Sequence, residues 1–106
     1  MRRAFVIGNV AIDEVFRMDR LPQSGESVLG GMRHVGLGGK GANQAIALAR
    51  AGVDTMLVAA VGIDAHAELL RRRLATEPVY AALIERSTLS TARSIVLADG
   101  PESVPL

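Results

Sequence analysis

Residues 38–52 read GGKGANQAIALARAG, and this stretch decides how the rest of the chain is interpreted. Its alanine-rich second part has high helix propensity, and Gly52 follows it as the expected C-terminal cap. Lys40 and Asn43 stand at the start of this helix, where unpaired backbone N–H groups and the helix dipole attract hydroxyl oxygens and phosphate. The stretch therefore predicts a helix over 41–51 whose N-terminal end accommodates a polyhydroxy or phosphorylated ligand.

The segment before this helix is predicted to form strands. A buried strand is expected at 4–7 and continues to residue 13, so that Asn9, Ala11 and Asp13 share one face. A strand with one solvent-exposed face follows at 14–20. After a turn at 22–25, residues 27–37 suit an exposed, irregular antiparallel strand because their glycines interrupt the alternation of apolar residues.

The segment after the helix alternates between strand and helix patterns. Residues 55–61 are of the kind buried on both faces of a sheet. Asp64 is expected to cap a helix that runs to residue 76, with Leu69, Leu70 and Leu74 facing inward. Two more strands are predicted at 79–84 and 94–98, and turn chemistry follows at 99–102. This order of elements predicts an α/β fold with an antiparallel pair inserted early.

Composition excludes several classes of function. The 106 residues carry a net charge of +1, and only 3% of them are aromatic, so we expect no nucleic-acid partner. The triplet at 71–73 is interpreted as the solvated face of a helix. The chain has no cysteine, which excludes thiolate metal sites and fits a cytoplasmic protein. Its longest apolar stretch, at 56–61, is far shorter than a bilayer span, so we expect no membrane partner.

Two phosphate-binding motifs fit the glycine-rich run poorly. A Walker-type P-loop requires a glycine where His34 stands and a hydroxyl residue where Gly41 stands. Residues 36–41 match G-x-G-x-x-G literally, but a dinucleotide site needs a buried apolar strand directly before the motif. Residues 30–35 do not form such a strand pattern, so a dinucleotide site is disfavoured.

The run from Gly38 to Ala45, followed by Gly52 and Gly62, resembles the first signature of the ribokinase (PfkB) carbohydrate kinase family. Every fixed position of that signature is met. Gly8 and Asp13 upstream also resemble the family's opening. The resemblance covers nearly the whole chain but only the N-terminal part of the family's fold.

This resemblance implies a Rossmann-like α/β core with a small antiparallel β-sheet lid over the sugar. We therefore expect residues 1–106 to be the N-terminal fragment of a single ribokinase-like domain, with lid strands at about 14–37 and further lid elements near the C-terminus. Several family members also dimerise through the lid, so a homodimer is an implied partner. The positions that match the family's substrate contacts are Asp13, Gly39, Lys40, Gly41 and Asn43.

The family transfers the γ-phosphoryl group of ATP to a hydroxymethyl group of a sugar or nucleoside with the help of Mg²⁺, and a monovalent cation is an added expectation. Its catalytic base and ATP pocket belong to a C-terminal glycine–aspartate motif that these residues lack. The resemblance thus implies that this chain carries the sugar-binding side of the active site, with no catalytic residue and no metal ligand. It also implies that the chain alone is inactive.

The acceptor is left open by one departure from the family pattern. Ribokinases proper tend to carry an Asn two residues before the sugar-binding Asp, where this chain has Ala11. Alanine cannot hydrogen-bond a sugar hydroxyl, so a nucleoside kinase of the same fold is an alternative to a sugar kinase. A third hypothesis is a truncated, non-catalytic module that pairs through its lid strands.

Overall fold

The computed structural model describes residues 3–31 and 33–99. Along the chain these form the following elements: β1 (Arg3–Ile7), β2 (Ala11–Met18), β3 (Arg33–Gly38), α1 (Lys40–Arg50), β4 (Asp54–Val61), α2 (Ala65–Leu74), β5 (Tyr80–Glu85) and β6 (Arg93–Asp99). The predicted α/β order is confirmed. The turn expected at 99–102 lies outside the described residues beyond Asp99.

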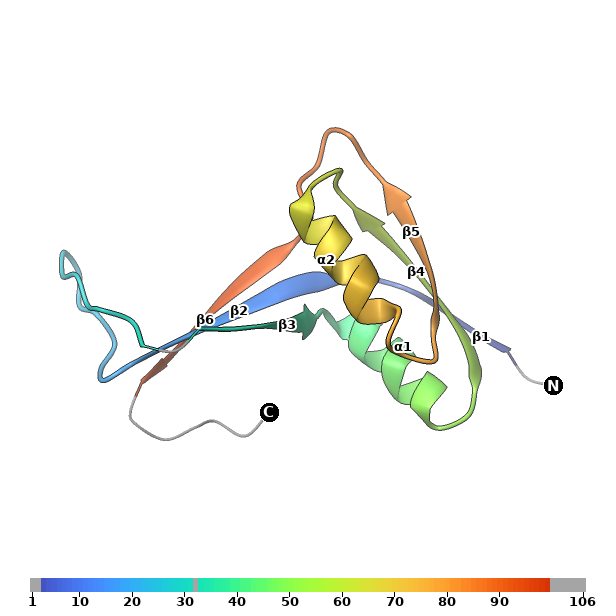
Figure 1. Ribbon diagram of the computed structural model, residues 1–106, viewed down its shortest axis with the longest axis horizontal. Coiled ribbons are helices and arrows are strands. Elements are labelled where there is room, and N and C mark those ends of the chain that lie inside the picture. Colours follow the sequence, from blue (N-terminus) through green and yellow to red (C-terminus); the bar gives the residue numbers. More distant parts are fainter. Residues whose placement is uncertain (1–2, 32, 100–106) are drawn as a thin grey trace.

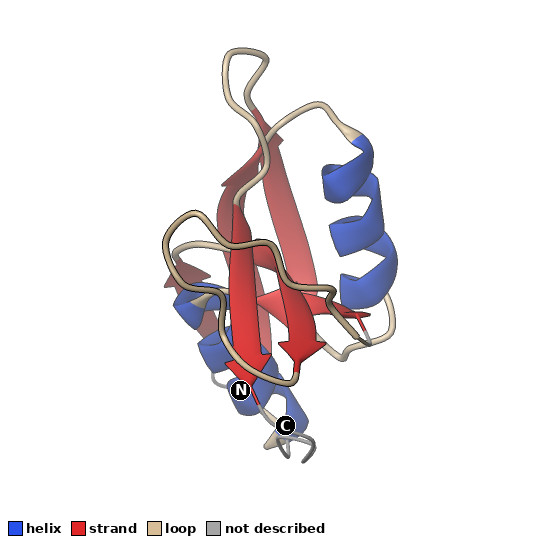
Figure 2. Cartoon of the chain, turned by 90° about the vertical axis from the view of Figure 1, so that its left-hand side faces the viewer, coloured by secondary structure: helices blue, strands red, loops and turns tan. Residues whose placement is uncertain are grey.

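The strands form two sheets, one parallel and one mixed. The first has the order β1-β4-β5, with both pairs parallel. The second has the order β3-β2-β6, in which β2 is antiparallel to β3 and parallel to β6. In Figure 1 the second sheet extends away from the helices. Figure 2 views the molecule from the side on which this sheet lies. The small sheet expected from the sequence is therefore mixed rather than purely antiparallel.

Both helices cover the same face of the first sheet. The crossovers from β1 to β4 and from β4 to β5 run in the same direction, and right-handed crossovers then place their helices on one side. The core joins small residues of α1 to larger ones of α2 and β4. Its buried members include Ala42, Ala45, Leu57, Ala59, Leu70 and Leu74.

The opposite face of the first sheet is apolar and open in the described part of the chain. The register places Phe5 and Ile7 beside Met56 and Val58, and these beside Tyr80 and Ala82. The large side chains on this face, Phe5, Ile7, Tyr80 and Ile84, are 52–83% exposed. The prediction that 55–61 is buried on both faces is wrong for this chain, because only the face toward the helices is covered.

The first predicted strand is also shorter than expected. The chain leaves the first sheet after Ile7 and enters the second at Ala11, so one continuous strand to residue 13 is wrong. Residues 8–10 form the link between the sheets, and Asn9 is not part of either strand. The expected strand at 27–37 is likewise confined to β3, which begins at Arg33.

Candidate functional site

Asp13, the predicted substrate-binding carboxylate, lies on β2 of the second sheet and not at the end of the first strand, where the sequence placed it. Register places it between Gly36 of β3 and Ser94 of β6, with its side chain half-buried. The Ser94 hydroxyl donates to Asp13 Oδ1 at 2.6 Å. A side chain at Gly38 would overlap the Asp13 carboxylate, so the two lie in direct contact. Because Gly38 ends β3 just before α1, this contact places Asp13 beside the start of the helix.

The start of α1 is held by the link between the sheets. Gly41 N donates to Asn9 Oδ1 at 3.1 Å, and Ala42 N donates to the Asn9 carbonyl oxygen at 3.0 Å. Asn9 therefore satisfies two of the amides that the sequence analysis treated as unpaired. These two groups are not available to a ligand in this conformation.

Gly39 and Gly41 pack against the same link. Gly39 has a φ of 96°, and a Cβ there would lie 2.8 Å from the Asn9 carbonyl oxygen. A Cβ at Gly41 would lie 2.9 Å from Gly8 Cα. Both positions thus require glycine for backbone packing alone. Their predicted contact with substrate stays a prediction.

Lys40 and Asn43 occupy the first turn of α1 and are exposed. Asn43 N donates to the Gly39 carbonyl oxygen at 2.9 Å, which begins the helical hydrogen-bond pattern. The five predicted residues are therefore gathered in one region: Asp13 against Gly38, and the other four at the first turn that follows it. The side chains of Lys40 and Asn43 extend from this turn into solvent.

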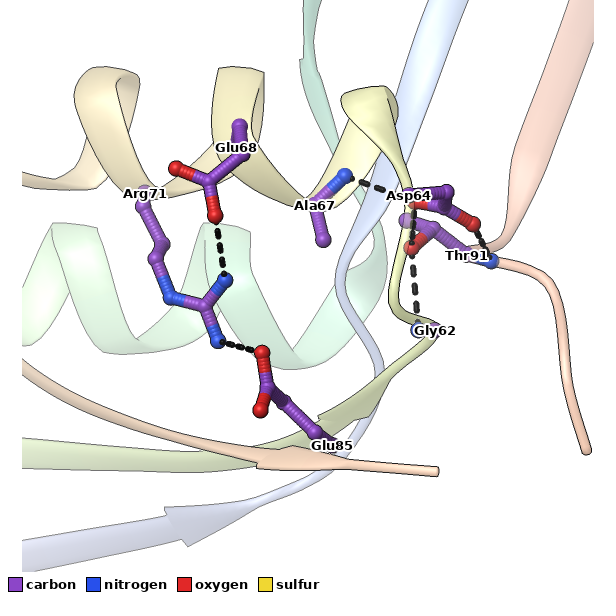
Figure 3. Close-up of polar contacts among 7 residues, drawn as sticks. All are labelled: Gly62, Asp64, Ala67, Glu68, Arg71, Glu85 and Thr91. Carbon is purple, nitrogen blue, oxygen red and sulfur yellow. Dashed lines mark hydrogen bonds and ion pairs between the residues drawn. The ribbon is translucent and has the colours of Figure 1, made fainter. Parts of the chain in front are cut away.

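A groove of about 420 Å³ runs along the Asp13 face of the second sheet. Its lining combines apolar and basic residues with the carboxylate of Asp13: Asp13, Val15, Arg17, His34, Gly36, Leu37, Arg73, Val96 and Ala98. Arg73 reaches it from α2 and donates to the Val35 carbonyl oxygen at 3.1 Å. The triplet at 71–73 is therefore not merely a solvated face. Neighbouring Arg71 pairs with Glu68 at 3.2 Å and Glu85 at 3.1 Å (Figure 3).

A second polar cluster ties the loop before β6 to the core (Figure 3). Asp64 caps α2 by accepting from Ala67 N at 2.9 Å, as predicted, and it also accepts from Thr91 N and from the Thr91 hydroxyl. The Thr91 hydroxyl accepts in turn from Gly62 N at 3.0 Å. These bonds, the Thr91 hydroxyl first, lower the pKa of Asp64 to about 2. The cluster fixes where β6, and therefore Ser94, enters the second sheet.

Sequence reasoning missed two side-chain pairs of the second sheet. Glu14 is 1% exposed and accepts from Arg93 Nε at 3.0 Å, although the alternation suggested a wet strand face. The sequence placed Ser94 in a strand but indicated no hydrogen-bond partner for its side chain. Both pairs join β2 to β6 across about 80 residues of chain, with separations of 79 and 81. No local pattern reveals which strands become neighbours over such a distance.

Comparison with known proteins identifies the family. Residues 1–103 match the family described as pfkB family carbohydrate kinase. The chain belongs to this family. Among its relatives is a ribokinase of Bacillus subtilis (strain 168), which is 39% identical over 106 residues, covering 98% of this chain and 36% of that protein.

Solved pfkB-family structures share the fold. The ribokinase of Cryptococcus neoformans var. grubii serotype A in complex with ADP is 31% identical, with a TM-score of 0.78 over 92% of this chain and 30% of that one. The nucleoside kinase of Methanocaldococcus jannaschii has a TM-score of 0.81 at 23% identity, covering 93% and 33%. The fold predicted from the sequence is confirmed. The chain spans about a third of the length of these relatives.

Among the described residues, no helix combines the length and apolar character that a membrane span requires. The same residues gather no set of three His, Asp or Glu side chains that could hold a metal ion. Residues 3–31 and 33–99 thus present no cluster that fits the Mg²⁺ ion implied by the resemblance.

Proposed function

We propose that residues 1–106 form the acceptor-binding part of an ATP-dependent kinase that phosphorylates the hydroxymethyl group of a sugar. The observation that supports this most directly is the Asp13 carboxylate, which is held against Gly38 at the start of α1 and at the edge of an open groove. A carboxylate offers several lone pairs to neighbouring hydroxyls, and its charge strengthens each hydrogen bond. Membership of the pfkB family and the named ribokinase relatives support a sugar as the acceptor.

In this proposal each predicted residue has a distinct task. Asp13 accepts from sugar hydroxyls, and Asn43 donates its carboxamide N–H groups to them from the first turn of α1. Lys40, on the same turn, offsets negative charge near the transferred phosphoryl group. Gly39 and Gly41 keep the helix close to residues 8–10, so that these side chains lie beside Asp13. ATP, Mg²⁺ and any monovalent cation are assigned to the remainder of the domain.

A phosphorylation screen of the full-length protein against pentoses, hexoses and nucleosides tests this proposal. Asp13→Asn removes the charge and is expected to raise KM for the preferred acceptor roughly 10- to 150-fold, the range for losing 1.5–3 kcal/mol. Asp19→Asn, in an exposed bend after β2, is the matched control and should leave KM unchanged. An unaltered KM for Asp13→Asn would remove this carboxylate from the acceptor site.

A nucleoside kinase is a second candidate because of the groove beside Asp13. Ala11 offers no hydrogen-bonding side chain, while Val15, Val96 and His34 give the groove apolar surface and an imidazole on which a planar base could rest. The same screen separates the candidates. A kcat/KM for nucleosides at least tenfold above that for free sugars supports this one, and the reverse order supports a sugar.

We further propose that residues 1–106 are the N-terminal part of a single larger domain whose remainder covers the open face of the first sheet. The exposed, mostly apolar large side chains of that face support this, because sheet faces that contact water normally carry polar residues. Ile7→Asp should strongly destabilise the full-length protein, whereas Leu29→Asp, at a loop position 95% exposed, should not. Equal melting temperatures for the two variants would contradict the proposal.

The outer face of the second sheet is proposed to contact a second copy of the protein. Phe16 and Met18 of β2 lie there beside Ile95 and Leu97 of β6 and line a groove of about 440 Å³. Apolar residues on the open face of a small sheet favour pairing with another such face. Leu97→Asp should convert a dimer into a monomer in sedimentation velocity, and a wild-type monomer at micromolar concentration would refute the contact.

A further inference from the structure

Ser94 bonds directly to Asp13, and the family signature does not account for it. Its hydroxyl donates to Asp13 Oδ1 at 2.6 Å, within the range of a charge-assisted O–H···O⁻ hydrogen bond. Strand alternation places Ser94 on the same face as Val96, which lines the groove, and its side chain is exposed. The Ser94 oxygen therefore borders the region in which Asp13 would hold an acceptor.

The hydrogen bond determines what this pair of side chains offers to a ligand. A serine hydroxyl has one proton, and here Asp13 receives it. The Ser94 oxygen keeps lone pairs, and the Asp13 carboxylate accepts through its second oxygen. The pair consequently presents two adjacent acceptors and no donor. Such a pair is satisfied by two neighbouring hydroxyl groups that both donate.

Ala11, toward the start of β2 from Asp13, offers no competing hydrogen-bond partner. It lies on the same face of β2, two residues before Asp13, is only 7% exposed, and carries a methyl group in place of any hydrogen-bonding group. A ligand hydroxyl that approaches Asp13 therefore has no partner on β2 toward the start of that strand. On β6, across from Asp13, Ser94 supplies one.

We propose that Ser94 is a specificity-determining residue, whose Asp13-bound hydroxyl accepts from a second hydroxyl of the acceptor and selects a vicinal diol over the corresponding deoxy compound. This rests on the proposed function, since it concerns the acceptor that Asp13 binds. A deoxy analogue would cover one of the two acceptors without supplying its donor, and such a mismatch costs binding energy that the intact diol avoids.

The test uses the full-length protein, its preferred sugar and the set of singly deoxygenated analogues of that sugar. Ser94→Ala should raise KM for the sugar about three- to tenfold with little change in kcat, as expected for one neutral hydrogen bond. For one deoxy analogue KM should not change, so that the selectivity for the sugar over that analogue falls by the same factor. Ser94→Thr, which keeps the hydroxyl, should restore the selectivity.

Ser90→Ala, in the exposed loop before β6, is the control and should behave as the wild type. If Ser94→Ala raises KM equally for the sugar and for every deoxy analogue, Ser94 only orients Asp13 and the inference is overturned. Unchanged KM values would overturn it as well. Should Ser94→Ala fail to fold, Ser94→Cys removes the hydroxyl at nearly constant volume and gives the same readout. A wild-type protein that phosphorylates no sugar or nucleoside would instead refute the proposed function.

Discussion

Replacing Gly39 by alanine tests how tightly the start of α1 is held against the link between the two sheets. Gly39 has a φ of 96° and a ψ of 137°, a backbone conformation found almost only in glycine, which costs other residues about 1–3 kcal/mol. The new Cβ would also lie 2.8 Å from the Asn9 carbonyl oxygen and 3.0 Å from Val10 Cα. Relieving such overpacking adds about 1–3 kcal/mol. We expect Gly39→Ala to lower the free energy of unfolding by roughly 2–6 kcal/mol in total.

Gly52→Ala is the matched control for this experiment. Gly52 has a nearly identical φ of 94°, but a Cβ there would meet nothing within 4 Å. Its replacement should cost only the backbone penalty of about 1–2 kcal/mol. Urea unfolding followed by far-UV circular dichroism compares the two variants. If Gly39→Ala is no more destabilising than Gly52→Ala, residues 9 and 10 shift at little energetic cost, and the tight packing inferred for this helix start is wrong.

The remaining predictions concern the core, the loss of stability at acidic pH and the hydrogen bond between Asn9 and the start of α1. Leu57→Ala, at a fully buried site, should lower the free energy of unfolding by about 2–5 kcal/mol, whereas Leu48→Ala, 37% exposed, should cost clearly less in the same urea titration. The hydrogen-bonded Asp64 carboxyl has a pKa of about 2 against an ordinary value of 3.8, so its stabilisation is complete above pH 3.8 and is lost as pH falls toward 2. Asp64→Asn should therefore flatten the fall of the melting temperature in this window, and an unaltered acid limb would argue against these bonds. Asn9→Ala removes the acceptor of the Gly41 amide and should destabilise by about 0.5–1.5 kcal/mol, with faster hydrogen exchange confined to the first turn of α1.

Local sequence signals predicted the elements well where each element is set by its own residues. The alanine-rich helix, its Gly52 end and the Asp64 cap all follow from short-range preferences, and the structure has them within one or two residues. The family signature likewise identified the helix start, because its glycines are needed where residues 8–10 approach the backbone closely.

The errors arose where distant segments decide the outcome. The strand pattern at 4–7 continues past Gly8 and Asn9 to residue 13, and local preferences do not show that the chain changes sheets after Ile7. The apolar pattern of β4 is the same whether its second face is covered or open. The Ser94–Asp13 hydrogen bond could not be foreseen, because it depends on β6 pairing with β2, a contact formed by residues 81 apart.

That pairing has a consequence for how the protein is made. β2 can form its antiparallel pair with β3 early, but its other edge waits for a parallel partner that the ribosome adds about 80 residues later. At a synthesis rate of roughly 5–20 residues per second, β2 remains half-paired for about 4–16 s. Such high contact order slows folding and leaves a strand edge open to wrong partners in the meantime. The nascent chain should therefore depend on chaperones most in the interval before residues 93–99 emerge from the exit tunnel.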